Sequence, residues 1–309
     1  MTDADRALLE LLRLLRSRDY QFVCPTPATH ATVIRRPDKA EAGDLRDVFG
    51  WSLRFQPQTI PTEAMALLAA ADALEHDGGW LKSRVRASSL GDTLVLHSAY
   101  PTDETDAVFF GPDSYRFARL IAQEMAGAAV PGRIVDIGGG AGAGLMTAAT
   151  LAPTGRLVLT DVNAKALRMA RINAAFAGIE IETVQTEGLQ GAPGPWDLIL
   201  ANPPYILDAA GRDYRDGGEL HGAQMSLDWA GEAMARLAPG GRFVLYTGSA
   251  IVGGADPLLE RLAPAAAAAG CELDYRELDP DVFGEELEQP GYADVERIAV
   301  VAATLTRPS

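Results

Sequence analysis

The sequence is poor in the features that mark secreted, membrane-spanning or nucleic-acid-binding proteins. It contains only two cysteines, Cys24 and Cys271, which lie far apart in a chain of 309 residues and so favour reduced thiols over a disulfide framework. No apolar run is long enough to cross a membrane, and residues 1–18 mix acids and arginines with leucines, unlike a signal peptide. We therefore expect a soluble, cytoplasmic protein.

Basic residues are also few relative to acidic ones. The 27 Lys and Arg residues against 42 Asp and Glu residues give a net charge of −15 and a pI of about 4.7. Proteins that bind nucleic acid gain much of their affinity by neutralising phosphates with Lys and Arg, so this composition disfavours such a partner. A local basic cluster would oppose the argument, because net charge is a global quantity. The candidate cluster consists of Arg35, Arg36, Arg84 and Arg86.

The first part of the chain, residues 1–105, predicts a small α+β domain. Leucines at helical spacing indicate an amphipathic helix over residues 5–18, and a second helix is expected over residues 61–74. Two short strands joined by a turn predict a hairpin over residues 84–98. Two helices and a hairpin are typical of a winged-helix-like domain, and we expect this domain to select the substrate. An acidic linker at residues 101–106 ends it.

The remainder, residues 106–309, alternates predicted strands and helices as a doubly wound α/β sheet does. We expect strands at 133–137, 156–160, 181–184, 196–201, 242–247, 271–278 and 295–304, and helices at 116–126, 142–152, 163–177, 224–238 and 256–269. The last two strands follow one another without a helix between them. The final strand is therefore expected to insert antiparallel into an otherwise parallel sheet.

A glycine-rich loop follows the first strand of this domain. The strand contains Asp136 and breaks into Gly138, Gly140 and Gly142, which let backbone approach a ligand closely. Gly138, Gly140 and Ala143 also satisfy a relaxed dinucleotide fingerprint. The loop thus predicts a nucleoside cofactor and leaves a nicotinamide enzyme open as an alternative.

Two acids after the next strands fit the same cofactor. Asp161 ends a strand about 20 residues past the glycine loop, where a carboxylate can accept hydrogen bonds from both ribose hydroxyls. The alternative is a helix N-cap, a role that Asn163 can fill instead. Glu187 follows the third strand and can accept from an adenine amino group, or it is an ordinary solvated acid.

The most specific motif is Asn202-Pro203-Pro204-Tyr205, which ends the strand at 196–201. Two consecutive prolines lock φ and supply no backbone donors, so the neighbouring carbonyls and the Asn202 side chain point in fixed directions. The Asn202 side-chain oxygen and the Pro203 carbonyl can accept both hydrogens of a planar amino group. Tyr205 offers a ring face on which a flat amide, guanidine or base can stack.

These motifs resemble those of class I S-adenosylmethionine (SAM) dependent methyltransferases with an Asn-Pro-Pro-Tyr loop. The closest resemblance is to the protein-glutamine N5-methyltransferases that modify translation release factors and to the related small-domain methyltransferases. It spans about residues 109–307 and includes the segment 111–114 and the helix at 164–174. It implies a Rossmann-like seven-stranded sheet, SAM as cofactor with S-adenosylhomocysteine (SAH) as product, and no metal. It also implies that Asp136 reaches the methionine amino group and that Asn202 is catalytic.

Other residues are weaker candidates for the substrate pocket. Phe110 and Tyr115 either line it or belong to the core, and His221 is either a base or an incidental loop histidine. The polar, glycine-hinged segment 212–222 resembles a lid that closes over substrate.

The sequence therefore predicts a SAM-dependent N-methyltransferase. Its acceptor is expected to be an amide, guanidine or amine nitrogen of a protein side chain or small molecule. Adenine N6 or guanine N2 of RNA or DNA is the alternative acceptor, since the same tetrapeptide serves exocyclic base amines. A non-catalytic binding module with this fold is the third hypothesis.

Overall fold

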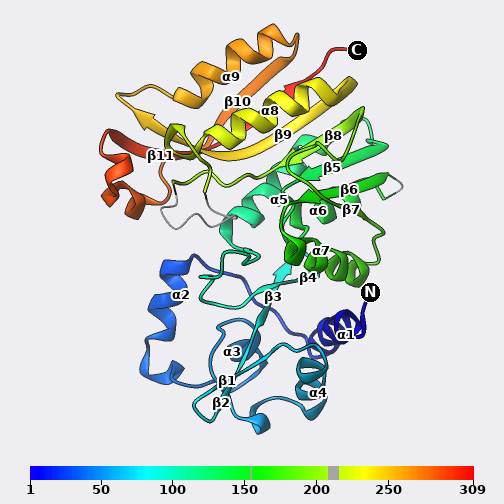
Figure 1. Ribbon diagram of the computed structural model, residues 1–309, viewed down its shortest axis with the longest axis vertical. Helices are drawn as coiled ribbons and strands as arrows, with labels where there is room; N and C mark the ends of the chain where they lie inside the picture. Colours follow the sequence, from blue (N-terminus) through cyan, green and yellow to red (C-terminus); the bar gives the residue numbers. More distant parts are fainter. Residues whose placement is uncertain (154, 208–215) are drawn as a thin grey trace.

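The structure is a computed structural model that describes residues 1–153, 155–207 and 216–309. A seven-stranded sheet forms the centre of its C-terminal part (Figure 1). The strands are β5 (Arg133–Ile137), β6 (Arg156–Asp161), β7 (Glu182–Gln185), β8 (Trp196–Ala201), β9 (Leu237–Val252), β10 (Glu272–Asp279) and β11 (Val295–Thr306). They are ordered β10-β11-β9-β8-β5-β6-β7, and only β11 runs antiparallel to its neighbours. The predicted antiparallel insertion of the last strand is confirmed.

Helices cover both faces of this sheet. They are α5 (Pro112–Met125), α6 (Ala143–Leu151), α7 (Ala164–Ala177), α8 (Gln224–Arg236) and α9 (Pro257–Ala268). Alternation along β5 shows how the layers arise, because successive side chains of a strand point to opposite faces. Ile134 packs with the side chains of α5, α6 and α7, whereas Val135 and Ile137 pack with those of α8 and α9. The α/β sandwich expected from the sequence is therefore the fold that forms.

The N-terminal part carries two hairpins and several helices. These elements are α1 (Asp3–Ser17), α2 (Pro27–Ile34), α3 (Leu45–Phe49), α4 (Thr62–Ala70), β1 (Leu74–Asp77), β2 (Trp80–Ser83), β3 (Val85–Leu90) and β4 (Thr93–Ser98). The predicted hairpin at 84–98 forms as β3 and β4, but α2, α3 and the β1–β2 hairpin were not predicted. Each of these helices and strands has eight residues or fewer, which is too short for a hydrophobic period to be recognised in the sequence.

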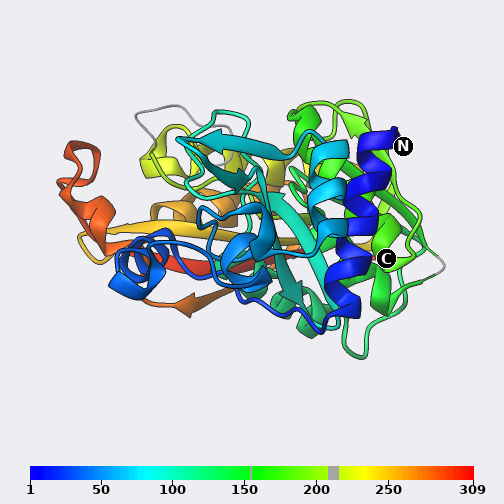
Figure 2. The ribbon, with the colours of Figure 1, turned by 90° about the horizontal axis from the view of Figure 1, so that it is seen from below.

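The core of the N-terminal part continues into the sheet domain. Helix α1 lies alongside α4, as Figure 2 shows, and also packs on α7. Its Leu11, Leu12 and Leu15 are fully buried, and each such side chain contributes about 1.5–3 kcal/mol. The same cluster includes Phe110 and Phe176 from beyond residue 105. A domain boundary near residue 105 thus remains a prediction from the sequence pattern.

One buried amide ties the two parts together. Asn173 of α7 is fully buried, and its Oδ1 accepts from the Leu96 backbone N–H at 2.8 Å. Its Nδ2 donates to the carbonyl oxygens of Leu96 and Ala141, each at 2.9 Å. A single side chain therefore holds β4 against the loop that precedes α6. No described helix is long and apolar enough to cross a membrane.

Replacing this amide should destabilise the whole chain. Asn173→Ala leaves three buried backbone groups without partners, and each such loss costs about 1–3 kcal/mol, so we expect a loss of several kcal/mol in the free energy of unfolding. Urea unfolding followed by circular dichroism measures it. Thr26→Ala, which removes the exposed N-cap of α2, is the control and should cost only about 1 kcal/mol. Equal losses in the two variants would contradict the bridging role.

Candidate active site

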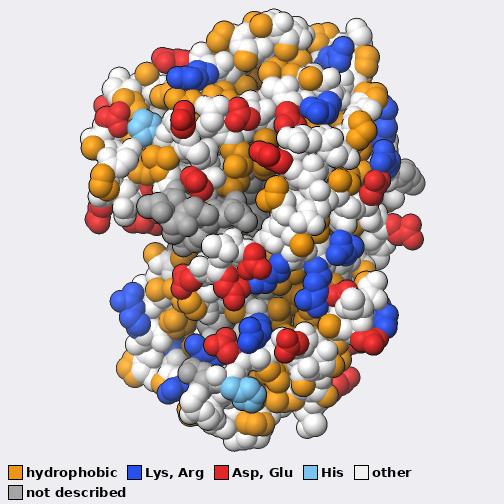
Figure 3. Space-filling view, viewed as in Figure 1, with side chains coloured by type: hydrophobic (Ala, Val, Ile, Leu, Met, Phe, Trp, Pro, Cys, Tyr) orange, Lys and Arg blue, Asp and Glu red, His pale blue; other side chains and the backbone are white. Residues whose placement is uncertain are grey.

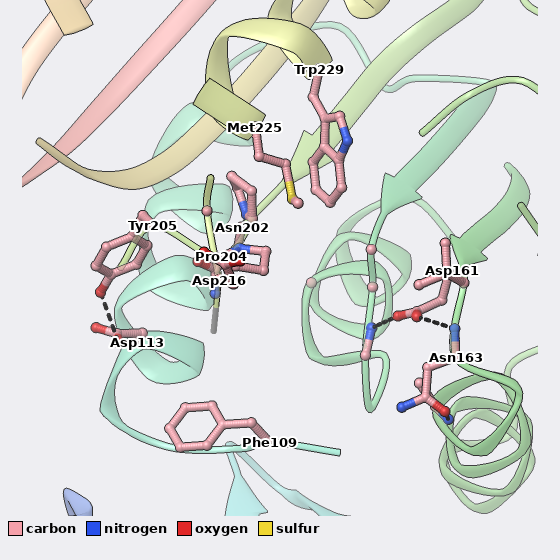
Figure 4. Close-up of a pocket in the computed structure, with 18 of the residues that line it drawn as sticks. Phe109, Asp113, Asp161, Asn163, Asn202, Pro204, Tyr205, Asp216, Met225 and Trp229 are labelled. Atoms are coloured by element: carbon pink, nitrogen blue, oxygen red, sulfur yellow. Dashed lines mark hydrogen bonds between the residues drawn. The ribbon is translucent and has the colours of Figure 1, made fainter. Parts of the chain in front are cut away.

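A cavity of about 550 Å³ opens where β5, β6 and β8 end. The cavity brings together ten of the residues singled out from the sequence. They are Phe110, Asp136, Gly138, Gly140, Asp161, Glu187, Asn202, Pro203, Pro204 and Tyr205. Figure 4 shows Asp161 on one side of this cavity and the tetrapeptide on the other. Carboxyl ends of parallel strands are where ligands bind in open α/β sheets.

Asp136 is a buried carboxyl group with one free oxygen. Its Oδ2 accepts from the Leu145 backbone N–H at 2.9 Å, while its buried Oδ1 has no hydrogen-bond partner among the described residues. Burial, together with the nearby charge of Asp161, raises the pKa of Asp136 to about 7, although the Leu145 hydrogen bond opposes the shift. A carboxylate held in this state favours a cationic or hydrogen-bond-donating ligand.

The glycine loop turns back under Asp161. Gly138 and Gly140 both have positive φ, +58° and +54°, which L side chains rarely adopt. A Cβ at residue 138 would lie 2.5 Å from the Trp229 ring, so the loop and this ring leave no room for a side chain. The Gly140 N–H donates to Asp161 Oδ2 at 3.0 Å. Gly142 does not line the cavity; it is the N-cap residue of α6.

Asp161 is not the residue that caps the next helix. The Asn163 side chain accepts from the Lys165 and Ala166 N–H groups and so serves as the N-cap of α7. Asp161 Oδ1 accepts from the Asn163 backbone N–H at 2.8 Å, and Asp161 lines the cavity. Val162 beside it is apolar yet 51% exposed, which gives the cavity a hydrophobic wall next to Glu187.

The tetrapeptide begins directly after β8. Asn202 is partly exposed in the cavity wall, and within the described part of the chain its side-chain amide makes no hydrogen bond. Figure 4 shows Met225 and Trp229 on one side of Asn202 and Phe109 on the other. The amide therefore faces a space bounded by sulfur and aromatic groups.

Tyr205 is anchored rather than open. Its ring is only 7% exposed, and its hydroxyl donates to Asp113 Oδ2 at 2.9 Å. The Phe283 ring meets it at an angle of 67° with centroids 5.8 Å apart. The sequence predicted a ring face available for stacking, whereas the structure buries most of this ring in the cavity wall.

Two predicted pocket residues lie elsewhere. Tyr115 packs in the core shared by both parts of the chain, and its hydroxyl accepts from the Cys24 N–H at 3.0 Å. His221 lies beside Asp294, with Nε2 and Oδ1 3.1 Å apart, and neither Tyr115 nor His221 lines the cavity. Part of the segment expected to form a lid, residues 212–215, lies outside the described residues.

Several wall residues were missed from the sequence. Asp113 at the start of α5, Met225 and Trp229 on α8, and Phe283 between β10 and β11 all line the cavity. Helix α8 was predicted, but no local signal indicates that residues of α8 or of the β10–β11 connection line the site, because only the tertiary fold brings their side chains there. Asp113 lay within the segment that carried the family resemblance, but its partners are distant in sequence.

Charge around the cavity is one-sided. The described residues of its wall include no Lys or Arg, and seven of them are acidic. These acids are Asp113, Asp136, Asp161, Glu187, Asp216, Asp228 and Glu232. Acidic and basic side chains are interspersed on the face of the molecule in Figure 3. The arginine cluster considered from the sequence does not form on the surface, because Arg86 is only 3% exposed and its Nε donates to the Ser98 carbonyl.

The strand order defines a Rossmann-like α/β domain, and its cavity lies at the carboxyl edge of the sheet, where ligands bind in open α/β folds. Comparison with known proteins agrees, since residues 107–247 match the family model described as "Methyltransferase small domain". These residues are thus similar to the methyltransferase small-domain family.

The chain is similar to two groups of curated relatives. A release factor glutamine methyltransferase of Deinococcus radiodurans is 33% identical over 201 residues, which cover 60% of this chain and 66% of that protein. A ribosomal RNA small subunit methyltransferase C of Pseudomonas entomophila is 33% identical over 102 residues, covering 29% of this chain and 31% of the relative. The matches thus span less than two thirds of these relatives' own lengths.

A solved structure of a SAM-dependent methyltransferase from Agrobacterium tumefaciens is also similar. It has a TM-score of 0.49 and 18% identity, and the match covers 76% of this chain and 72% of that one.

The raised pKa of Asp136 predicts that a cationic ligand releases a proton on binding. With a pKa of about 7, most of the apoprotein carries a protonated Asp136 at pH 6, and an ammonium group favours the ionised form. Calorimetric titration of SAM at pH 6 in buffers of different ionisation enthalpy should therefore show a net release of protons on binding. Asp136→Asn should bind at least about tenfold more weakly and release none.

Stability supplies a second readout for the same group. Because folding raises the pKa of Asp136, its contribution to the stability of the apoprotein is present below the unfolded value and is lost as pH rises through about 7. Asp136→Asn should thus raise the melting temperature of the apoprotein at pH 8 relative to wild type more than it does at pH 5. If the wild-type protein instead binds SAM at pH 6 without releasing a proton, the raised pKa of Asp136 and its contact with the ammonium group are wrong.

Proposed function

We propose that the chain is a SAM-dependent N-methyltransferase that acts on a planar nitrogen of a protein side chain or small molecule. The observation that carries the proposal is one cavity with the free Asp136 oxygen and Asp161 on one side and Asn202 on the other. The match of residues 107–247 to the methyltransferase small-domain family model supports the proposal.

The residues present fit the cofactor. The unpartnered Asp136 Oδ1 matches an ammonium group, and the Asp161 carboxylate can accept from vicinal ribose hydroxyls. The exposed apolar side chain of Val162 can cover a purine, with Glu187 accepting from its amino group. Small residues at 138–140 let the backbone approach the ligand. The described wall residues include no Lys or Arg that could pair with a pyrophosphate. This favours SAM over a dinucleotide, because SAM has no phosphate.

Catalysis by this chain would consist mainly of positioning. SAM supplies an activated methyl group on a sulfonium. The Asn202 side-chain oxygen and the Pro203 carbonyl would accept the two N–H groups of the acceptor and leave the nitrogen lone pair free. Both acceptors are neutral, and the two prolines hold them in place. Orientation of this kind is worth about 7–11 kcal/mol in favourable systems. Met225, Trp229 and Phe109 would exclude water from the reacting atoms.

The charge of the wall supports a protein or small-molecule acceptor. A phosphate-bearing acceptor would meet seven carboxylates and no described Lys or Arg in this cavity. The release factor named in one group of relatives is a protein acceptor of this kind. We further propose that residues 1–105 select the acceptor, since Pro27 of α2 reaches the cavity wall. A cytoplasmic location remains a prediction from the sequence.

The second candidate is methylation of an exocyclic base amine in RNA. The relative named as a ribosomal RNA methyltransferase favours it, and Asn202 would act in the same way on such an amine. The two candidates differ in the charge that the acceptor carries, so they can be separated by binding.

Asn202→Ala tests the catalytic role. The variant should lower methyl transfer from tritiated SAM at least about 100-fold and change SAM affinity less than about threefold, because Asn202 orients the acceptor. The acceptors offered are a purified bacterial release factor, small-subunit ribosomal RNA and a protein extract. Gln224→Ala, on the cavity rim, is the control. Methylation by Asn202→Ala at the wild-type rate would exclude this role.

Binding to nucleic acid separates the two acceptor classes. We expect no mobility shift with total RNA or duplex DNA at 150 mM salt, on the order of physiological ionic strength, because the net charge is −15 and the cavity wall is acidic. A gel-shift titration at two salt concentrations measures it. Salt-sensitive binding that is lost in the double variant Arg35→Glu/Arg36→Glu would make RNA the favoured class of acceptor.

A further inference from the structure

Asp113 receives hydrogen bonds from three elements at once. Its Oδ2 accepts from the Tyr205 hydroxyl at 2.9 Å, and its Oδ1 accepts from the Tyr246 hydroxyl at 2.7 Å. The Arg116 guanidinium donates to Oδ1 at 3.2 Å and also reaches Asp279 at 3.3 Å. The carboxyl group is 7% exposed and lies in the cavity wall. Asp113 therefore joins α5 to the loop after β8 and to β9, and Arg116 extends this link to β10.

Tyr205 has little freedom apart from this contact. A Cβ at residue 248 of β9 would lie 2.2 Å from Cδ2 of the ring, so the ring packs directly on Gly248. Phe283 bounds it edge to face. Burial, with the charge of Asp113 adding to it, raises the pKa of the Tyr205 phenol well above its usual value. The hydroxyl thus stays protonated and remains a donor to Asp113.

The link from Tyr205 to Asn202 is short and stiff. Pro203 and Pro204 lie between them, and proline holds φ near −65°. Fixing the Tyr205 ring therefore limits the directions that the Pro203 carbonyl and the Asn202 side chain can take. The Asn202 side chain makes no hydrogen bond among the described residues, so its backbone is held by the paired strand β8 before it and by the anchor at Tyr205 after it.

We propose that Asp113 is a positioning residue that acts through the Tyr205 hydroxyl to orient Asn202 and the Pro203 carbonyl toward the acceptor. The inference rests on the proposed function, which gives those two acceptors their role. It changes the role expected for Tyr205, whose hydroxyl holds the loop and whose ring forms part of the wall. Tyr246 and Arg116 in turn hold Asp113.

The asparagine content of the chain makes the proposal measurable without an acceptor. There are only three asparagines, Asn163, Asn173 and Asn202. Protein labelled with ¹⁵N-asparagine should give three backbone N–H signals and three side-chain pairs, and the set that disappears in Asn202→Ala belongs to Asn202. Asn173 is held in the core by three hydrogen bonds and Asn163 caps α7, so both serve as internal references.

Four variants make the test specific. Asp113→Asn and Tyr205→Phe each weaken or remove the anchor, and the double variant tests whether they act as one unit. Tyr275→Phe is the matched control, because the Tyr275 hydroxyl donates to Asp256 Oδ2 at 2.7 Å in a similar tyrosine–carboxylate pair outside the cavity. Tyr205→Phe keeps the ring and its packing, so it is expected to fold even where Asp113→Asn is destabilised.

The expected result is a selective change at Asn202. Its signals should shift and its backbone ¹H–¹⁵N NOE should fall in Asp113→Asn, in Tyr205→Phe and, to the same extent, in the double variant. The Asn163 and Asn173 signals should stay in place, and Tyr275→Phe should leave all three unchanged. SAH affinity should change less than about threefold, whereas turnover of any acceptor found should fall about 10–100-fold.

Two outcomes would overturn the proposal. One is an Asn202 signal that is unaltered in Tyr205→Phe and Asp113→Asn; the other is an equal disturbance of all three asparagines, which indicates a general structural role. A failure of the wild-type protein to bind SAH would instead remove the proposed function, and the NMR comparison would still decide whether Asp113 holds the loop.

Discussion

The site depends on the parallel register of three strands. Ile137 of β5 pairs with Thr160 of β6 on one side and with Ala201 of β8 on the other. The residues that follow these three are Gly138, Asp161 and Asn202, so the glycine loop, the acid and the tetrapeptide all begin at one level of the sheet. A slip of one residue would turn Asp136 and its neighbours to the opposite face. The hydrophobic alternation that buries Ile134 and Val135 on different faces therefore also sets the geometry of the cavity.

Polar groups at this edge are held at a cost to folding. Burial and the nearby Asp161 raise the pKa of Asp136, which means that its ionised form is disfavoured in the apoprotein. The surrounding structure compensates through extensive packing, including the core that α1 shares with α7. Asn173 fixes β4 to the Ala141 carbonyl directly beside the glycine loop. The N-terminal part is thus joined to the wall of the cavity that carries the glycine loop. A change in the packing of one should therefore alter the position of the other.

Local sequence patterns were sufficient to predict the α/β sheet and the part of the site that lies at the ends of its strands. Strands such as β8 are nearly continuous apolar runs, and the motifs with Asp136, Asp161 and Asn202 lie in them or follow them, so the sequence indicated these residues as one site. The other half depends on tertiary contacts. Trp229 reaches the cavity because it closes over Gly138, and Phe283 does so from a connection distant in sequence.

The incorrect predictions from the sequence also concern residues whose environment is set by tertiary contacts. The sequence suggests a surface position for Arg86, but β3, which carries it, is buried on both faces along much of its length. Tyr205 was expected to present its ring, and only the position of Asp113 shows that its hydroxyl is the anchored group. Neither contact has a local signature, because the partners are 92 residues apart for Tyr205 and Asp113.

The central claim is that the cavity at the ends of β5, β6 and β8 holds SAM opposite Asn202. Calorimetric titration of the purified chain with SAH, and separately with NADH, tests it most directly. One SAH per chain should bind, NADH should give no binding heat, and Asp161→Ala should weaken SAH at least about tenfold, because a charge-assisted hydrogen bond is worth about 1.5–3 kcal/mol. Saturable binding of NADH without any binding of SAH would contradict the claim.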